Sequence, residues 1–166
     1  MNNKEKDYLY ILESHKKIIF KVAHNYCFKE EDKDDLIQEI ILQVWLSMDN
    51  FDNKHKWSTW IYRIALNTSI SFYRKNKKRE EKTISLAPAI EVQDLSIDDN
   101  VADDVILLNQ FIRELRELDR ALILLHLDGL TSREIAEVIN ISQTNVTTKI
   151  SRIKTILKEK FNQIKK

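Results

Sequence analysis

Hydrophobic side chains recur along the first half of the chain every three or four residues, which gathers them on one face of a helix. Over residues 7–28 this pattern predicts an amphipathic helix. Its apolar stripe consists of Tyr8, Ile11, Leu12, Ile18, Ile19, Val22, Ala23 and Tyr26. A second helix is predicted to open at the acidic run 32–35, because carboxylates stabilise the positive N-terminal end of a helix. Its buried face would consist of Leu36, Ile37, Ile40, Ile41, Val44 and Trp45.

A third helix is predicted from Trp57 to Lys77, after a polar loop over residues 49–56. The side chains expected to pack inward are Trp57, Trp60, Ile61, Ile64, Ala65, Thr68 and Phe72. The other side of this helix is mainly basic, and aromatic rings among cations are typical of surfaces that stack single-stranded bases. We interpret Trp60 as a core residue. For Phe51 and Trp57, at the edges of the loop, core packing and base stacking both stay open.

Helical periodicity is lost over residues 80–104, a stretch that is rich in acids and contains the single proline, Pro88. This composition indicates a linker. A helical pattern resumes at Val105, and the apolar run Ala121–Leu127 is expected to be buried. The chain is therefore predicted to be all-α, with two small helical domains over 1–79 and 105–166.

The pattern of residues 129–157 predicts a helix-turn-helix. Thr131 and Glu134 have the spacing of a capping box, and Ile135, Ala136, Val138 and Ile139 follow at helical intervals. Asn140 falls where a left-handed turn residue is needed, and Ser142 can cap a second helix. The apolar stripe of that second helix is Val146, Ile150, Ile153 and Leu157. Its other side carries hydroxyls and cations, which suit the major groove of DNA.

The composition supports helices and excludes several classes of protein. One glycine and one proline in 166 residues leave no material for β-hairpins or glycine-rich phosphate loops. Cys27 is the single cysteine, so no internal disulfide can form and a reducing cytoplasm is expected. No apolar run is long enough for a signal region or a membrane span, so no membrane insertion is expected. His24 and Cys27 could hold a metal, but no second pair follows, and neither metal nor cofactor is predicted.

Charge is unevenly distributed although the net charge is only +1. Residues 51–79 carry 8 basic and 1 acidic side chains, and residues 126–166 carry 8 basic and 4 acidic ones. Between them, residues 80–125 carry 4 basic and 11 acidic side chains. Two basic helical segments separated by an acidic one predict two parts that contact nucleic acid.

Two other classes of protein are consistent with parts of this pattern. A helix-turn-helix transcriptional regulator would bind duplex DNA by itself, usually as a dimer, with residues 1–79 as its sensing or dimerising part. An enzyme such as a recombinase would need a nucleophilic serine beside arginines, or a carboxylate metal site. Ser14 has no arginine near it in sequence, and Asp34 and Asp35 are explained by helix-start electrostatics. We therefore expect no enzymatic activity.

Three motifs, taken in order, resemble the sigma-70 family of RNA polymerase sigma factors, in particular the small extracytoplasmic-function group. Asp35-Leu36-Ile37-Gln38-Glu39 is similar to the family's D-L-x-Q-E run, and residues 60–67 closely follow its W-[LI]-Y-x-I-A-x-N run. Gly129-Leu130-Thr131 with Glu134-Ile135-Ala136 is similar to its G-L-S-x-x-E-I-A run. The resemblance covers residues 7–79 and 105–161, and leaves the linker unmatched.

The resemblance implies a cytoplasmic transcription initiation factor whose partners are core RNA polymerase, promoter DNA and an anti-sigma factor. The face that would bind the polymerase clamp helices comprises Asp35, Gln38, Glu39 and Gln43. The melted non-template strand of the minus-ten element would contact Phe51, Arg63, Ile64, Asn67, Arg74, Lys75 and Lys78. A flipped base would enter a pocket between Phe51, Ile64, Asn67 and the loop 52–56. The duplex minus-thirty-five element would contact Thr147, Thr148, Lys149, Ser151, Arg152 and Lys154.

Two positions depart from the residues that are common in the family. Ser71 stands where aspartate is common, and Asn145 stands where threonine is common. The predicted recognition helix also carries fewer arginines than usual. The resemblance therefore does not give the promoter sequence that this chain prefers.

Overall fold

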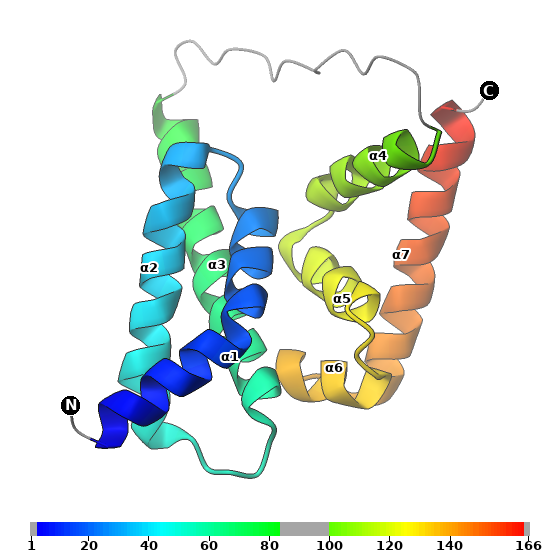
Figure 1. The fold of residues 1–166 in the computed structure, drawn as a ribbon. Helices are drawn as coiled ribbons and strands as arrows, with labels where there is room; N and C mark the ends of the chain where they lie inside the picture. The colour runs from blue at the N-terminus through cyan, green and yellow to red at the C-terminus, as the bar shows by residue number, and fades with distance from the viewer. Residues whose placement is uncertain (1–2, 84–99, 165–166) are drawn as a thin grey trace. The chain divides into compact units, whose positions relative to one another are not determined.

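The computed structural model describes residues 3–83 and 100–164, and within these ranges every regular element is a helix (Figure 1). The all-α fold class is thus confirmed. The helices are α1 (Asn3–Tyr26), α2 (Glu30–Ser47), the 3-10 turn η1 (Met48–Asn50), α3 (Trp57–Thr83), α4 (Asn100–Glu114), α5 (Glu117–Leu127), α6 (Ser132–Ile139) and α7 (Gln143–Ile164). The chain forms two compact units, one made mainly of α1–α3 and the other mainly of α4–α7.

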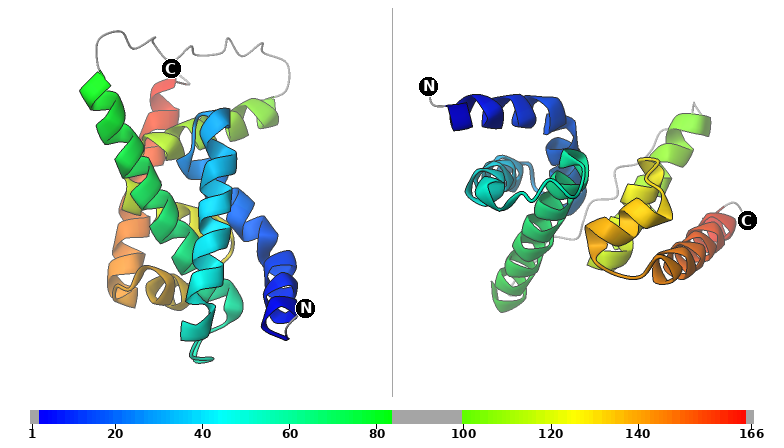
Figure 2. Two further views of the ribbon diagram at one scale, coloured as in Figure 1. Left: turned by 90° about the vertical axis from the view of Figure 1, so that its left-hand side faces the viewer. Right: turned by 90° about the horizontal axis from the view of Figure 1, so that it is seen from below.

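The three helices α1, α2 and α3 of the first unit lie side by side (Figure 2), and they share an apolar core. Its buried side chains include Ile19, Val22, Leu36, Ile40, Ile61 and Ala65. Tyr8 fastens the start of α1 to the second half of α2: its hydroxyl donates a hydrogen bond to the carbonyl of Ile41 at 3.0 Å. Its ring packs edge to face with the ring of Trp45 at a centroid distance of 4.8 Å. Burial raises the pKa of the Tyr8 hydroxyl above its ordinary value.

The inward face of α3 differs in part from the expected one. Ile61 and Ala65 are buried as predicted, together with Tyr62, Leu66 and Ser69, which the pattern did not single out. The other residues that were expected to pack inward are only half-buried: Trp57, Trp60, Ile64, Thr68 and Phe72. Trp60 is therefore not the core residue that we predicted. The turn before α3 brings its ring to Phe51 and Trp57 instead.

Two helices extend into the predicted linker. α3 continues to Thr83 and α4 already begins at Asn100, so both ends of the stretch 80–104 are helical. Residues 84–99, with Pro88, lie outside the described residues. The backbone hydrogen bonds of a helix propagate without an apolar face, so periodicity underestimates the length of a helix whose end is polar.

The second unit packs α5 and α4 against α7. The rings of Phe111 on α4 and Phe161 on α7 meet edge to face at 5.1 Å, and Lys160 forms an ion pair with Glu114 beside them. Residues 121–125 are buried as expected, but Leu127 is 55% exposed. The expectation that the whole run is buried was wrong at this end, because α5 stops there and the chain turns at the surface.

Candidate nucleic-acid and protein interfaces

The turn between α6 and α7 has the geometry that the sequence predicted. The Glu134 carboxylate accepts hydrogen bonds from the backbone N–H and the hydroxyl of Thr131, each at 3.0 Å, and the Glu134 N–H donates to the Thr131 hydroxyl at 3.2 Å. Asn140 has a φ of 60°, and the Ser142 hydroxyl accepts a hydrogen bond from the Asn145 N–H at 3.2 Å. The capping box, the left-handed residue and the second cap are confirmed, and they fix where α7 begins.

The packing of α7 decides which of its residues face outward. Val146, Ile150, Ile153 and Leu157 are buried as expected. At about 100° per residue, the opposite side of the helix is centred on Thr148. The exposed predicted contacts are Thr147, Thr148, Ser151, Arg152 and Lys154. Lys149 is half-buried, and it flanks the buried stripe on the side opposite to Lys154.

This arrangement places hydroxyls and one guanidinium at the centre of the outward face and an ammonium group at each edge. A helix lying in the major groove turns its centre toward base edges and its flanks toward the two phosphate strands. Sequence reasoning missed two hydroxyls on the central strip, Thr144 and Thr155, and the carboxamide of Asn145. All three are exposed. Thr144 precedes Thr148 by four residues and Ser151 by seven, a spacing that could have identified it.

A basic stripe runs along α3 in the first unit. At about 100° per residue, all its members lie within about 120° of arc, on the side opposite to the buried Ile61, Ala65 and Ser69. The stripe consists of Trp60, Arg63, Ile64, Asn67, Ser71, Arg74, Lys75 and Lys78. Asn67, Arg74, Lys75 and Lys78 are exposed, whereas Arg63 and Ile64 are half-buried. The packing of α3 therefore brings every predicted minus-ten residue of this helix to one side.

Three aromatic rings lie together where the loop enters α3. Phe51 stacks on Trp57, with ring centroids 3.5 Å apart and planes inclined by 21°. Trp60 meets both rings edge to face, at 5.5 Å and 5.3 Å. All three side chains are half-buried, so one part of the cluster packs and another part is accessible. Such rings, at one end of a basic stripe, can stack an unpaired base.

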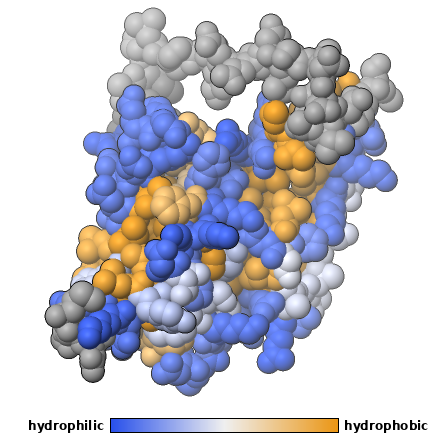
Figure 3. All heavy atoms as spheres, viewed as in Figure 1, coloured by the Kyte–Doolittle hydropathy of each residue, from blue (hydrophilic) through white to orange (hydrophobic). Residues whose placement is uncertain are grey.

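The outward face of α2 is mixed rather than polar. Asp35 and Gln38 are exposed, Glu39 and Gln43 are half-buried, and the Gln43 amide donates a hydrogen bond to the Glu39 carboxylate at 2.9 Å. The sequence analysis did not identify two leucines on this face, Leu42 and Leu46, which follow Gln38 by four and eight residues. Leu42 is 48% exposed and Leu46 is 59% exposed. Figure 3 shows apolar side chains at the surface over α1 and α2. An apolar patch bordered by acids and amides is typical of a protein-binding surface.

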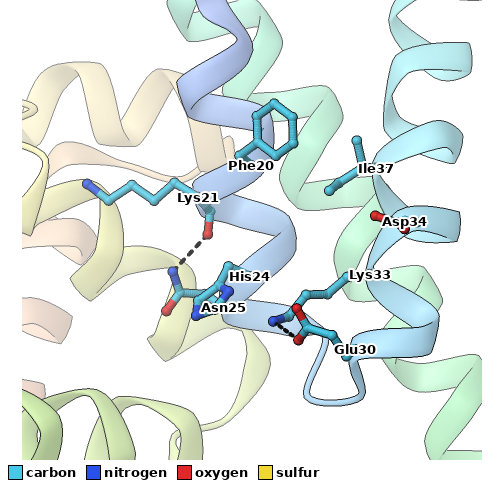
Figure 4. A pocket seen from close by; sticks show the side chains of 8 residues that line it. All are labelled: Phe20, Lys21, His24, Asn25, Glu30, Lys33, Asp34 and Ile37. Carbon is cyan, nitrogen blue, oxygen red and sulfur yellow. Dashed lines mark hydrogen bonds and ion pairs between the residues drawn. The ribbon is translucent and has the colours of Figure 1, made fainter.

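An open cleft of about 520 Å³ lies between the second half of α1 and the first half of α2 (Figure 4). Phe20 and Ile37 supply its apolar wall, and Lys33 forms an ion pair with Glu30 at its edge. The hydrogen bond and charge of Lys33 lower the pKa of the Glu30 carboxyl. The side chains that line the cleft carry charges of both signs, so the cleft favours neither anionic nor cationic ligands.

The Cys27 thiol is buried and donates a hydrogen bond to the carbonyl of Lys29 at 3.4 Å, and burial raises the pKa of the thiol.

Among the residues that the structure describes, no group of three or more His, Cys, Asp or Glu side chains is placed to hold a metal ion. No helix within 3–83 and 100–164 is long and apolar enough to cross a bilayer.

Both units of the chain match known protein families. Residues 11–79 match the family model described as Sigma-70 region 2, and residues 106–157 match that of Sigma-70 region 4. The RNA polymerase sigma factor SigZ of Bacillus subtilis is 30% identical over 128 residues, which cover 76% of this chain and 70% of the relative. The ECF RNA polymerase sigma factor SigW of the same organism is 26% identical over 165 residues, covering 93% of this chain and 88% of the relative.

Two solved structures share the fold at 19% sequence identity. CnrH, determined in complex with the cytosolic domain of CnrY, superimposes with a TM-score of 0.69, over 96% of this chain and 90% of CnrH. The sigma factor RpoE, determined in complex with the anti-sigma factor NepR from Bartonella quintana, gives a TM-score of 0.67, over 93% of this chain and 94% of RpoE.

Proposed function

The chain belongs to the extracytoplasmic-function group of sigma-70 RNA polymerase sigma factors, and we propose on this basis how its surfaces carry out transcription initiation. Residues 1–79 act as region 2, which binds core polymerase and the minus-ten element. Residues 105–166 act as region 4, which reads the minus-thirty-five element, and residues 80–104 connect the two. The observation that carries the proposal is the pair of outward faces, one basic on α3 and one of hydroxyls and cations on α7.

The outward face of α2 docks on the clamp helices of the polymerase core. Asp35, Gln38, Glu39 and Gln43 supply hydrogen-bond acceptors and donors, and the exposed Leu42 and Leu46 supply apolar area. Burying both leucines against a partner helix provides affinity, while the polar groups around them select the orientation of the two helices.

The α3 stripe and the aromatic cluster bind the minus-ten element once it is opened. Arg63, Arg74, Lys75 and Lys78 follow the phosphates, and an extruded base stacks beside Phe51, with Ile64 and Asn67 completing its pocket. Extruding a base costs a few kcal/mol of lost stacking. Stacking on an aromatic ring returns about 1–3 kcal/mol per base. Stacking on the cluster can therefore offset most of the cost of extruding that one base.

The α7 face enters the major groove of the minus-thirty-five element. Thr147, Thr148, Ser151 and Arg152 approach base edges, and Lys149 and Lys154 neutralise phosphates on either side. The protein traps melted DNA and performs no covalent chemistry of its own. It works in the cytoplasm, where core polymerase and the bacterial chromosome are found.

An anti-sigma protein regulates this factor by covering the α2 face. CnrH and RpoE, which share the fold, were solved with a cytosolic partner domain and an anti-sigma factor respectively. On this chain, the exposed leucines of α2 offer such a partner the same apolar patch that the polymerase needs. Occupation of that patch by one partner excludes the other.

Reconstitution with bacterial core polymerase tests the proposal. The purified chain should be retained by immobilised core enzyme, and the holoenzyme should start run-off transcripts at defined positions on genomic DNA. In a gel-shift series, the holoenzyme should bind a promoter fragment tightly and the free protein only weakly. A free protein that binds duplex DNA strongly and specifically as a dimer would indicate an ordinary helix-turn-helix regulator instead.

A further inference from the structure

We infer that Asn145 selects an adenine within the minus-thirty-five element, an assignment that rests on the proposed role of α7. Asn145 lies in the first turn of α7 and its side chain is exposed. Its backbone N–H donates to the Ser142 hydroxyl at 3.2 Å, which fixes the turn on which the carboxamide stands. In a helix-turn-helix, residues near the start of the second helix are the ones that reach base edges.

Asn145 shares a strip of α7 with two other outward side chains. Thr148 and Arg152 follow it by three and seven residues and are also exposed. At about 100° per residue, the three side chains lie within about 60° of arc, so they meet the same groove. Seven residues rise by about 10.5 Å, which is about three base-pair steps of the duplex.

The chemistry of the two ends of this strip differs and predicts two bases. A carboxamide can accept from N6–H2 of adenine and donate to its N7 at the same time, whereas a guanidinium donates to both O6 and N7 of guanine. The methyl group of Thr148, between them, fits the methyl group of thymine. Asn145 therefore reads an adenine about three base pairs from a guanine read by Arg152.

Promoter selection by the holoenzyme tests this assignment. A template library randomised across the minus-thirty-five element is transcribed by holoenzyme containing the wild-type chain, Asn145→Ala or Asn145→Arg. Asn162→Ala makes the same chemical change on an exposed residue near the other end of α7 and is the matched control. We expect the wild-type chain and Asn162→Ala to enrich adenine at one position. Asn145→Ala should lower this preference by about 5- to 150-fold at that position alone. Asn145→Arg should replace adenine by guanine there.

A second measurement separates base reading from a general loss of affinity. Replacing the selected adenine by 7-deazaadenine removes the N7 acceptor, which should weaken the wild-type holoenzyme and leave Asn145→Ala unaffected. Unchanged base selection by Asn145→Ala, or equal losses at every position, overturns the assignment while the sigma activity stands. A wild-type holoenzyme that starts no transcripts overturns the proposed function and this assignment with it.

Discussion

The guanidinium of Arg120 donates a hydrogen bond to the backbone carbonyl of Leu115 at 3.1 Å, from a side chain that is only 1% exposed. A second bond from the same group reaches the carbonyl of Arg113 near the end of α4. The last carbonyls of a helix have no partner within the helix, so a donor from α5 satisfies them and fixes the turn between the two helices. The buried guanidinium of Arg120 therefore stabilises the second unit, to which α7 belongs.

We predict that Arg120→Leu destabilises the second unit by about 2–3 kcal/mol, because buried carbonyls lose charge-assisted hydrogen bonds. All three tryptophans, Trp45, Trp57 and Trp60, belong to the first unit. Urea unfolding followed by circular dichroism should therefore show an earlier transition, while tryptophan fluorescence keeps its midpoint. Arg116→Leu, at a side chain that is 85% exposed, is the control and should leave both signals unchanged. Equal midpoints for the two variants would contradict the role given to Arg120.

Tyr8 is one of the groups whose raised pKa should lower the stability of the first unit in alkaline solution, together with Tyr62 and Cys27. The pKa of Tyr8 is raised in the folded chain, so the unfolded chain releases the hydroxyl proton at a lower pH than the folded chain does. The stabilising contribution is present below the ordinary tyrosine pKa of about 10 and is lost as the pH rises through the folded value. Denaturation midpoints from about pH 9 to about pH 11 should decline less steeply for Tyr8→Phe than for the wild-type chain. Tyr10→Phe, at a tyrosine that is 75% exposed, should follow the wild-type slope.

The exposed leucines of α2 should contribute to binding of core polymerase. We expect Leu42→Ala to weaken that binding by about 5- to 30-fold, which corresponds to about 1–2 kcal/mol of apolar burial. Titration of fluorescently labelled protein with core enzyme measures the dissociation constant. Leu9 is exposed to the same degree as Leu42, at 49% against 48%, but lies on α1, so Leu9→Ala is a matched control. If the two variants bind equally well, the α2 face is not the docking surface.

The aromatic cluster should act in opening the promoter rather than in closed-complex binding. Phe51→Ala removes the ring that stacks on Trp57, and it should lower open-complex formation by about 5- to 150-fold, the equivalent of about 1–3 kcal/mol of stacking. Permanganate reactivity of unpaired thymines reports the open complex, and a template melted in advance should restore transcription. Phe28→Ala changes an exposed aromatic residue outside the cluster, in the same unit, and should have no such effect. Failure of the melted template to rescue Phe51→Ala would indicate a folding defect instead.

Local interactions made much of this protein predictable from its sequence. The capping pair Thr131 and Glu134, the positive φ of Asn140 and the Ser142 cap each involve residues within a few positions of one another, so the residue types fix the geometry. The buried stripe of α7 followed for the same reason, because a helical repeat assigns residues to faces. The two helical units and their basic segments could also be predicted from the local pattern of residues.

Only the tertiary structure decided which apolar residues are covered and which polar ones are not exposed. Trp60 and Leu127 fit apolar patterns, yet one joins a half-buried cluster and the other lies at the surface. Arg120 lies in the buried part of α5. A charged side chain is expected there only if carbonyls outside α5 accept its hydrogen bonds. Periodicity states which side chains share a face, but the covering of that face depends on contacts between helices distant in sequence.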